Sequence, residues 1–365
     1  MKIKQLVVIY MNNLKILTKG NENKTAGRDL IVNNNNIVNN NNNNNLDYLQ
    51  IKEIATDVFR LNCIELSNQA QKKIIERVEE FISIYINKLK NENLEDINEF
   101  KNPDLQYALY TAQKGYVRSG DKDLEEVLVD LLVDRTKENN RNLKQIVLNE
   151  ALETISKLTS IQLDMLSVAF LLRYTKDQKI NNFETFYIYL KTYFNPFINN
   201  LGSNISSIQH LEFTGCGNNQ LSSIDIIEIF KNHYWGIFCK GFTLEEYNKK
   251  INFESKKPIK CINNNNLYQI EAINKEYFEK NKNSLKINEK EIKKLYDFQN
   301  EFIMTNEEIK TKIISKNPDF DNFFSYLSKS SLKNFTLTSV GIAIAIANIH
   351  RKTNIKLELD IWVKE

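Results

Sequence analysis

The sequence predicts a mainly α protein: a helical bundle with a smaller mixed α+β C-terminal region and a flexible Asn-rich N-terminal tract. The 365 residues include only 10 Gly and 4 Pro, the residues that most often interrupt helices. Apolar residues recur at helical spacing from Leu46 onward. The tract "TAGRDLIVNNNNIVNNNNNNN" has too few apolar residues to offset the entropy lost on ordering. We therefore expect a low-complexity tract at 1–45, a helical domain at 46–200 and a mixed α+β domain at 201–365.

The first helices are predicted from apolar spacing and from their end signals. Residues 46–90 indicate two helices, or one long helix broken near Ser67. Residues 104–118 predict the next helix. Gly120 is expected to end it, and another helix is expected to begin at Asp121 or Asp123.

Capping boxes, in which a Ser or Thr is followed three residues later by Glu or Gln, predict later helix starts. Thr159 and Gln162 have this spacing, which places 104–200 in a nearly continuous bundle. In the mixed region the same spacing predicts helix starts at Thr243 and Thr305.

Short strands are expected in the C-terminal third. The segments "YWGIFCKGF" at 234–242 and "LYQIEAI" at 267–273 are strand candidates. Residues 356–363, "KLELDIWV", alternate strictly between apolar and polar side chains, which predicts a half-buried strand.

Composition points to no particular class of partner. The 49 Lys and Arg nearly balance 46 Asp and Glu, and the net charge of +3 indicates neither a nucleic-acid nor a membrane partner. No run approaches the roughly 20 apolar residues of a membrane helix, and the start "MKIKQLVVIY" lacks the long apolar stretch of a signal peptide. The 4 cysteines form no C-x-x-C pair. A cytoplasmic protein with reduced thiols is the expectation.

Acidic residues at 121–134 offer one candidate metal site. Asp130 and Asp134 follow Glu126 at successive i, i+4 positions and could seat Mg²⁺. The same spacing is also what the solvated face of an amphipathic helix shows. Both interpretations stay open, and the helix face is the simpler one.

Cys216 is the candidate nucleophile. It lies in "TGCGN", where two glycines expose backbone amides, and His210 is the histidine near it in sequence. A tight turn explains the same residues. His210 with Cys216 and His233 with Cys239 are each six apart, which allows a zinc site or scattered structural residues. Nucleotide-binding, zincin and hydrolase motifs are missing, so the sequence favours a non-enzyme without a cofactor.

Four segments carry a family resemblance. The runs "IKEIATDVFRLNCIELSNQAQKKIIERVEEF", "PDLQYALYTAQKGYVRSGDKDLEEVLVDLLVDRT", "HLEFTGCG" and "LKNFTLTSVGIAIAIANI" resemble an uncharacterised bacterial family. Its members begin with a glycine- and polar-rich segment followed by a helical module similar to one in bacterial conflict and phage-defence proteins. The resemblance implies a defence context, with a phage protein or another trigger as partner, and no catalytic residues. The tract here is richer in asparagine than the family's.

The tract itself allows two interpretations. It is a disordered tether, or it orders when copies meet, because stacked chains gain asparagine ladders and aligned apolar rows. In the second case Ile31 and Ile37 stack, Gly27 eases a turn, and Arg28 pairs with Asp29 of a neighbouring copy.

Three hypotheses of function follow. The favoured one is a non-enzymatic homo-oligomer that acts as a sensor or effector in antiviral defence. The second is a metal-dependent nuclease or a Cys hydrolase. The third is a membrane-perturbing effector that exposes "VGIAIAIANI" at 340–349, a segment that also fits a tightly packed C-terminal helix.

Overall fold

The structure is a computed structural model that describes most of the chain after the Asn-rich tract. The described residues are 48–62, 68–94, 99–199, 201, 205–220, 225–251, 257–272, 274–285 and 287–364. They fall into two compact units. Unit 1 holds the described residues up to Gly120 together with Arg135–Asn139, and unit 2 holds Asp121–Asp134 and Asn140 onward.

In the described part of unit 1, three helices pack against one another. They are α3 (Tyr48–Asn62), α4 (Asn68–Asn91) and α5 (Pro103–Ser119), with the short 3₁₀ helix η2 (Glu99–Lys101) before α5. Ile51, Ala55 and Phe59 recur every four residues of α3 and are all buried, as the helical pattern predicts. Gly120 ends α5 in the left-handed conformation with φ of 64°.

Two buried polar side chains complete unit 1. Tyr85 of α4 is fully buried and its hydroxyl lies 2.5 Å from the hydroxyl of Thr136. The guanidinium of Arg135 is also buried; it pairs with the carboxylate of Asp104 in the first turn of α5 and donates to the carbonyl of Glu138 at 2.8 Å. Both of these side chains therefore have a partner within the unit, whereas Oε1 of the buried Gln113 has no hydrogen-bond partner among the described residues.

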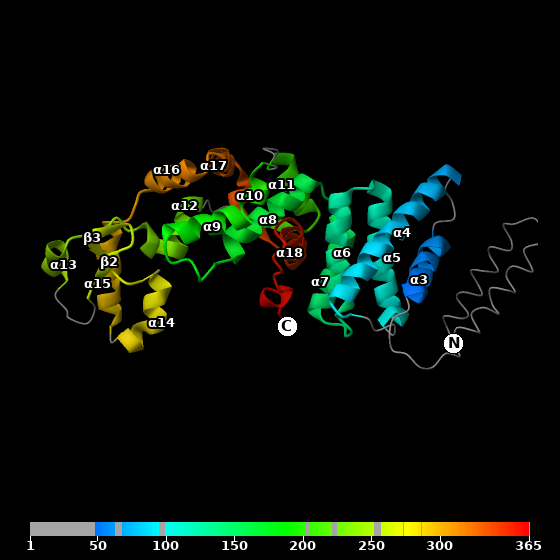
Figure 1. The fold of residues 1–365 in the computed structure, drawn as a ribbon, viewed down its shortest axis with the longest axis horizontal. Helices are drawn as coiled ribbons and strands as arrows, with labels where there is room; N and C mark the ends of the chain where they lie inside the picture. The colour runs from blue at the N-terminus through cyan, green and yellow to red at the C-terminus, as the bar shows by residue number, and fades with distance from the viewer. Residues whose placement is uncertain are drawn as a thin grey trace, which may run out of the picture. The chain divides into compact units, whose positions relative to one another are not determined.

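Unit 2 contains the larger set of helices, drawn from cyan-green to red in Figure 1. Helix α6 (Lys122–Thr136) belongs to unit 2 as far as Asp134, and its last two residues belong to unit 1. The other elements that the structure describes in unit 2 as helices are α7 (Leu143–Ile155), α8 (Ser160–Tyr174), α9 (Phe183–Tyr193), α10 (Asn195–Ile198), α11 (Ile205–Phe213), α12 (Ile226–Tyr234), η3 (Trp235–Phe238), α13 (Leu244–Lys250), α14 (Lys275–Leu285), α15 (Glu289–Asn300), α16 (Asn306–Lys316), α17 (Asp319–Lys329), η4 (Ser331–Asn334), α18 (Ser339–Thr353) and η5 (Leu359–Ile361).

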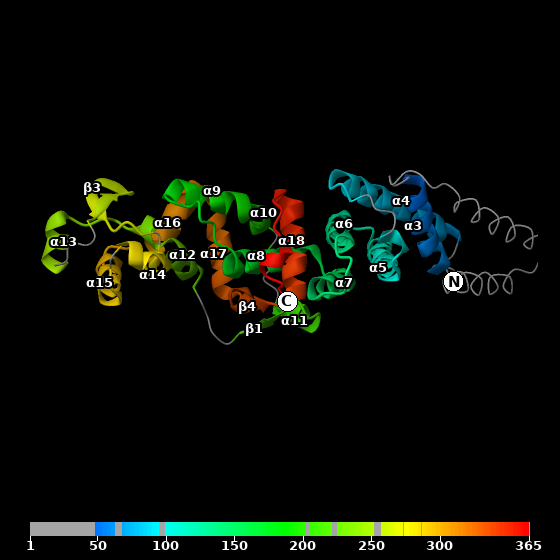
Figure 2. The same ribbon diagram turned by 90° about the horizontal axis from the view of Figure 1, so that it is seen from below.

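Helices α8 and α18 form the centre of unit 2. They cross and contact each other, and α18 also packs on α7 (Figure 2). Every residue of α8 from Gln162 to Leu172 is buried, as is every residue of α18 from Gly341 to Ile349. A helix that is buried on all sides belongs to a core. These two helices therefore form the core of unit 2.

One small antiparallel sheet lies at the start of α18. Strand β1 (Gly217–Asn219) pairs with β4 (Phe335–Leu337), and Gly217 is opposite Leu337. Because α18 begins two residues after β4, this pairing brings the Cys216 turn to the first turn of α18.

A second antiparallel pair stands apart from the first. Strand β2 (Ile259–Cys261) pairs with β3 (Asn264–Gln269), and the register shifts between Lys260 and Cys261. The predicted strand at 267–273 overlaps β3.

The structure confirms the mainly α class and the capping boxes at Thr159, Thr243 and Thr305. The strand predicted at 356–363 is wrong: the segment folds into η5, with the amide of Val363 donating to the carbonyl of Leu359 at 3.0 Å. Likewise, the 234–242 segment holds η3 where a strand was predicted. In the part of the chain that the structure describes, no helix is both long and apolar enough to span a bilayer.

Candidate functional site

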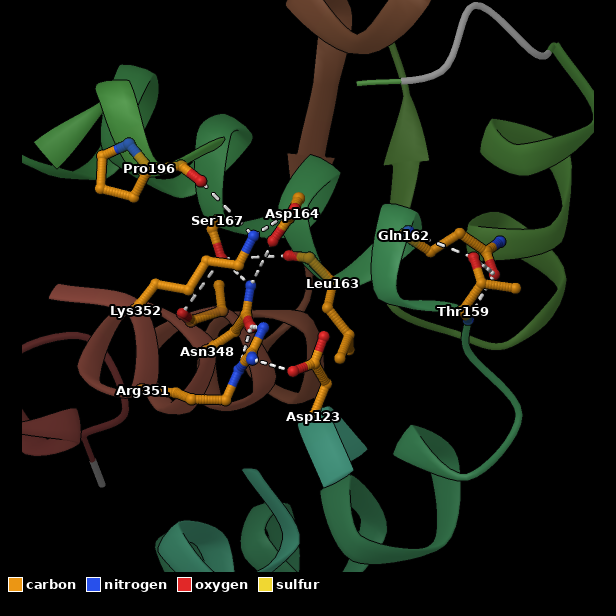
Figure 3. A network of polar contacts seen from close by, with 11 residues as sticks. Asp123, Thr159, Gln162, Leu163, Asp164, Ser167, Pro196, Asn348, Arg351 and Lys352 are labelled. Carbon is orange, nitrogen blue, oxygen red and sulfur yellow. Dashed lines mark hydrogen bonds and ion pairs between the residues drawn. The ribbon is translucent and has the colours of Figure 1, made fainter. Parts of the chain in front are cut away.

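A buried polar network joins α8 to the C-terminal half of α18, and we take it as the candidate functional site (Figure 3). Asn348 and Ser167 are completely buried and Asp164 is nearly so. The amide nitrogen Nδ2 of Asn348 donates to Oδ1 of Asp164 at 3.0 Å and to Oγ of Ser167 at 2.9 Å. Ser167 in turn donates to the carbonyl of Leu163 at 3.0 Å. The centre of the network is therefore a chain of satisfied hydrogen bonds in an apolar core.

Lys352 supplies the positive charge that this buried carboxylate needs. Its ammonium nitrogen lies 2.6 Å from Oδ2 of Asp164, and the two side chains are 14% and 1% exposed. The same nitrogen lies 5.3 Å from the centre of the Phe197 ring and 3.4 Å from the carbonyl of Pro196. Such a desolvated pair is expensive to break, because the partner left behind remains a buried charge.

Arg351 closes the network on its other side. Its Nε and Nη2 donate to Oδ1 of Asn348 at 3.2 and 3.1 Å, while Nη1 lies 2.6 Å from the carboxylate of Asp123 on α6. The Asn348 amide thus uses both N–H donors and both acceptor positions of its oxygen. Asn348 thus contacts Asp164, Ser167 and Arg351 at the same time.

The neighbouring residue His350 extends the same set of contacts to α6. Its Nδ1 lies 2.9 Å from Oδ2 of Asp130, which is 7% exposed at the side chain. Four polar residues therefore hold the C-terminal half of α18 to α6 and α8: Asn348, His350, Arg351 and Lys352. The arrangement holds this half of the helix in place.

The predicted nucleophile Cys216 lies away from this network, at the first turn of α18. Its side chain is buried, and burial raises the pKa of the thiol. Thr214 donates to the sulfur at 3.5 Å. The carbonyl of Cys216 accepts from the amide of Thr338 at 3.1 Å and faces Gly341 so closely that an added Cβ would lie 1.9 Å away. These contacts are those of a packed turn, and a raised pKa disfavours the thiolate that attacks a substrate.

His210 has another partner than the sequence suggested. Its Nδ1 lies 2.9 Å from Nε2 of Gln162, the residue that closes the capping box of α8. The described contacts put Thr214, not His210, at the Cys216 sulfur.

The acidic residues of α6 separate in their roles. Asp130 binds His350, and Asp134 is half-buried one turn further on. His233 lies at the end of α12, where burial and then the charge of Lys176 lower its pKa.

Among the residues that the structure describes, no group of three His, Cys, Asp or Glu side chains is placed to hold a metal ion. The predicted assembly residues Gly27, Arg28, Asp29, Ile31 and Ile37 lie outside the described residues.

Sequence reasoning missed the centre of the network. Asp164 and Asn348 each interrupt an apolar run, in "QLDMLSVAF" and in "IAIANI". A polar residue inside an apolar helix requires a buried partner, and this signal could have identified both positions. It could not have paired them, because they are far apart in the chain.

Comparison with known proteins adds one match. A family model with the description ":-like", an uncharacterised family, matches residues 45–363, so it covers both units and every residue of the network. No curated protein and no solved structure matches the chain. From residue 45 to residue 363, the chain therefore belongs to this uncharacterised family.

Proposed function

We propose that the protein acts in bacterial antiviral defence as a non-enzymatic sensor or effector that works as an oligomer. The observation that carries the proposal is the buried network that holds α18, an apolar helix, in the core of unit 2. The resemblance of the helical segments to modules of bacterial conflict proteins supplies the context.

The polar groups of the network form their hydrogen bonds with other groups of the protein. Both carboxylate oxygens of Asp164 accept from side chains of α18, and Asp130 is bound by His350. Groups engaged in this way position helices; they do not act on a substrate. This favours a protein that works through contacts with other macromolecules.

As part of this proposal, α18 has a packed state and a released state. In place, every member is paired; with one member removed, a buried charge or amide loses its partner, which costs about 3–5 kcal/mol for a buried ion pair. A trigger that binds the protein better with α18 released would shift the population toward that state. Release would expose the stretch Gly341–Ile349, which is apolar except for Asn348, and an apolar face is a surface on which copies can associate.

Assembly is proposed to involve the Asn-rich tract as well. Its β-branched residues Ile31 and Ile37 recur among asparagines, and stacked copies would gain a small contribution at every interface. This part of the proposal rests on the sequence pattern alone.

A plaque assay tests the proposed function. A bacterial strain without the gene is made to express the full-length protein and is challenged with a panel of unrelated phages. We expect fewer plaques for at least one phage, and we expect a deletion of residues 1–45 and Ile31→Asp with Ile37→Asp to abolish the protection.

Two control variants make the result specific. Ile31→Val with Ile37→Val keeps the apolar rows and should keep the protection. Lys280→Met removes a lysine that is 70% exposed at its side chain and should also have no effect. The proposal is overturned if no phage is restricted at a verified protein level, or if the deletion protects as well as the full chain.

A further inference from the structure

Two buried thiols meet at one turn of unit 2, apart from the α18 network. Cys239 follows η3 and Cys261 ends β2; both are at most 1% exposed. The amide of Gly241, with φ of 93°, donates to the sulfur of Cys239 at 3.4 Å, and an added Cβ on Gly241 would lie 3.1 Å from the sulfur of Cys261. The thiol of Cys261 lies 3.4 Å from the carbonyl oxygen of Cys239. Glycine is thus needed where the backbone passes between the two sulfurs.

The side chain of Asn263 ties this turn to a lysine. Its Nδ2 donates to the carbonyls of Ile237 and Cys239, each at 2.8 Å. Its Oδ1 accepts from the ammonium of Lys312 on α16 at 2.8 Å. The lysine is further held 4.3 Å from the centre of the Phe183 ring. A positive charge is therefore fixed beside the two thiols.

The two thiols differ sharply in acidity. A hydrogen bond from Cys239, then the backbone amides of Asn263 and Asn264 and the charge of Lys312, outweigh burial and lower the pKa of Cys261 to about 6. The same contact and burial raise the pKa of Cys239. The direction of the two shifts makes Cys261 the more acidic thiol of the pair and so the better candidate for the attacking sulfur.

A pocket of about 240 Å³ opens beside the pair. Its wall includes Gly236 and Ile237, which precede Cys239, and Ile259 and Ile262, which flank Cys261. The two cysteines themselves are not among the lining residues, so the pocket brings open space to their chain neighbours and not to the sulfurs directly.

We propose that Cys239 and Cys261 form a redox couple that reacts with peroxides. The thiolate of Cys261 attacks one oxygen of hydrogen peroxide, the O–O bond breaks, and the products are the sulfenic acid of Cys261 and hydroxide, which is neutralised by a proton from the buffer. The sulfur of Cys239 then attacks the sulfenic sulfur; its proton and the sulfenic hydroxyl leave as water, and a Cys239–Cys261 disulfide remains. Peroxide is the two-electron oxidant of the sequence. The disulfide links β2 to the segment after η3.

The first test uses the full-length wild-type protein. Reduced protein is treated with hydrogen peroxide at neutral pH, quenched, and mapped by mass spectrometry. We expect a Cys239–Cys261 disulfide and an oxidation rate for Cys261 about tenfold or more above that of Cys216, whose buried thiol has a raised pKa. Cys216 reacting as fast, or a disulfide between other cysteines, overturns the proposal.

Variants separate the two thiols. In Cys239→Ser the sulfenic acid of Cys261 should accumulate and be trapped by a dimedone probe, while Cys261→Ser should leave Cys239 unreactive. Lys312→Met should slow the oxidation of Cys261, and Lys310→Met, a lysine of the same helix that pairs with Glu307, should not. Should a serine variant fail to fold, the wild-type map and the lysine pair still decide the question.

The pH dependence adds a readout that a purely structural pair would not show. Lys312 is the charged group that favours the Cys261 thiolate, together with the Cys239 thiol. The rate of Cys261 oxidation should be nearly constant above pH 7 and fall about tenfold between pH 7 and pH 5. A rate that climbs about tenfold per unit from pH 7 to pH 8, as for an ordinary thiol, refutes the assignment.

Discussion

Replacing Lys352 by methionine removes the charge of the buried pair and keeps most of the side chain's length. In the native protein the Lys352 ammonium is 2.6 Å from Asp164, and the carboxylate is only 1% exposed at its side chain. The variant leaves that carboxylate with Asn348, at 3.0 Å, as its remaining donor among the network contacts described above.

The size of the effect follows from this loss. Removing one partner of a buried ion pair costs about 3–5 kcal/mol. Because the Lys352 side chain keeps 14% exposure, water can reach the site in part, and we expect the free energy of unfolding to fall by about 2–3 kcal/mol. The double variant with Asp164→Asn should be more stable than Lys352→Met alone, since a neutral amide is less costly to bury than an unpaired charge.

Tryptophan fluorescence during urea unfolding reports on unit 2, which contains the Lys352–Asp164 pair. The chain has 2 Trp, and both Trp235 and Trp362 belong to unit 2. Lys280→Met is the matched control: Lys280 and its partner Glu276 are 70% and 54% exposed at their side chains, and we expect a change below about 0.5 kcal/mol. If Lys352→Met is no less stable than Lys280→Met, the network does not hold α18 and the reasoning fails.

Three further predictions concern single contacts. Gly341→Ala should lower the free energy of unfolding by about 2 kcal/mol or more in the same urea assay, because its Cβ would meet the Cys216 carbonyl 1.9 Å away. Millimolar Mg²⁺ should leave the melting temperature unchanged, because His350 already binds Asp130 at 2.9 Å; a rise seen by calorimetry, absent in Asp130→Asn, would argue for a metal site. Burial raises the pKa of Tyr85 above its ordinary value of 10, so the unfolded chain ionises first and unit 1 should lose stability as the pH rises above 10; a Tyr85→Phe variant followed by circular dichroism should lack this slope.

Local signals in the sequence were reliable for helix ends. Gly120 and the Thr159, Thr243 and Thr305 boxes act through contacts within one turn, so the sequence alone contains both partners of each interaction. The same reasoning explains why the mainly α class was predictable.

The strand prediction at 356–363 failed because the structure of that segment depends on contacts with residues far away in the sequence. A strand needs a neighbour to pair with, and residues 356–363 instead turn at η5, where the Trp362 indole nitrogen donates to the carbonyl of Tyr174 at 3.0 Å and its ring meets Phe170. Alternation of side chains alone does not show whether a partner exists.

The candidate site was hidden for the same reason. Asp164, Asn348 and Lys352 are brought together by the crossing of α8 and α18, which no local pattern records. The low pKa of Cys261 comes first from Cys239, which lies far from it in sequence, then from the nearby backbone amides of Asn263 and Asn264, and then from the distant Lys312.

The mass of the particle in solution tests the central claim of an oligomer most directly. Sedimentation velocity over a wide concentration range compares the full-length chain, the deletion of residues 1–45, and Ile31→Asp with Ile37→Asp. The account predicts that the full chain sediments as a multimer of the 42.8 kDa monomer and that both variants shift toward the monomer while staying folded. A full chain that remains a 42.8 kDa monomer at every concentration, or three proteins with one identical distribution, would contradict it.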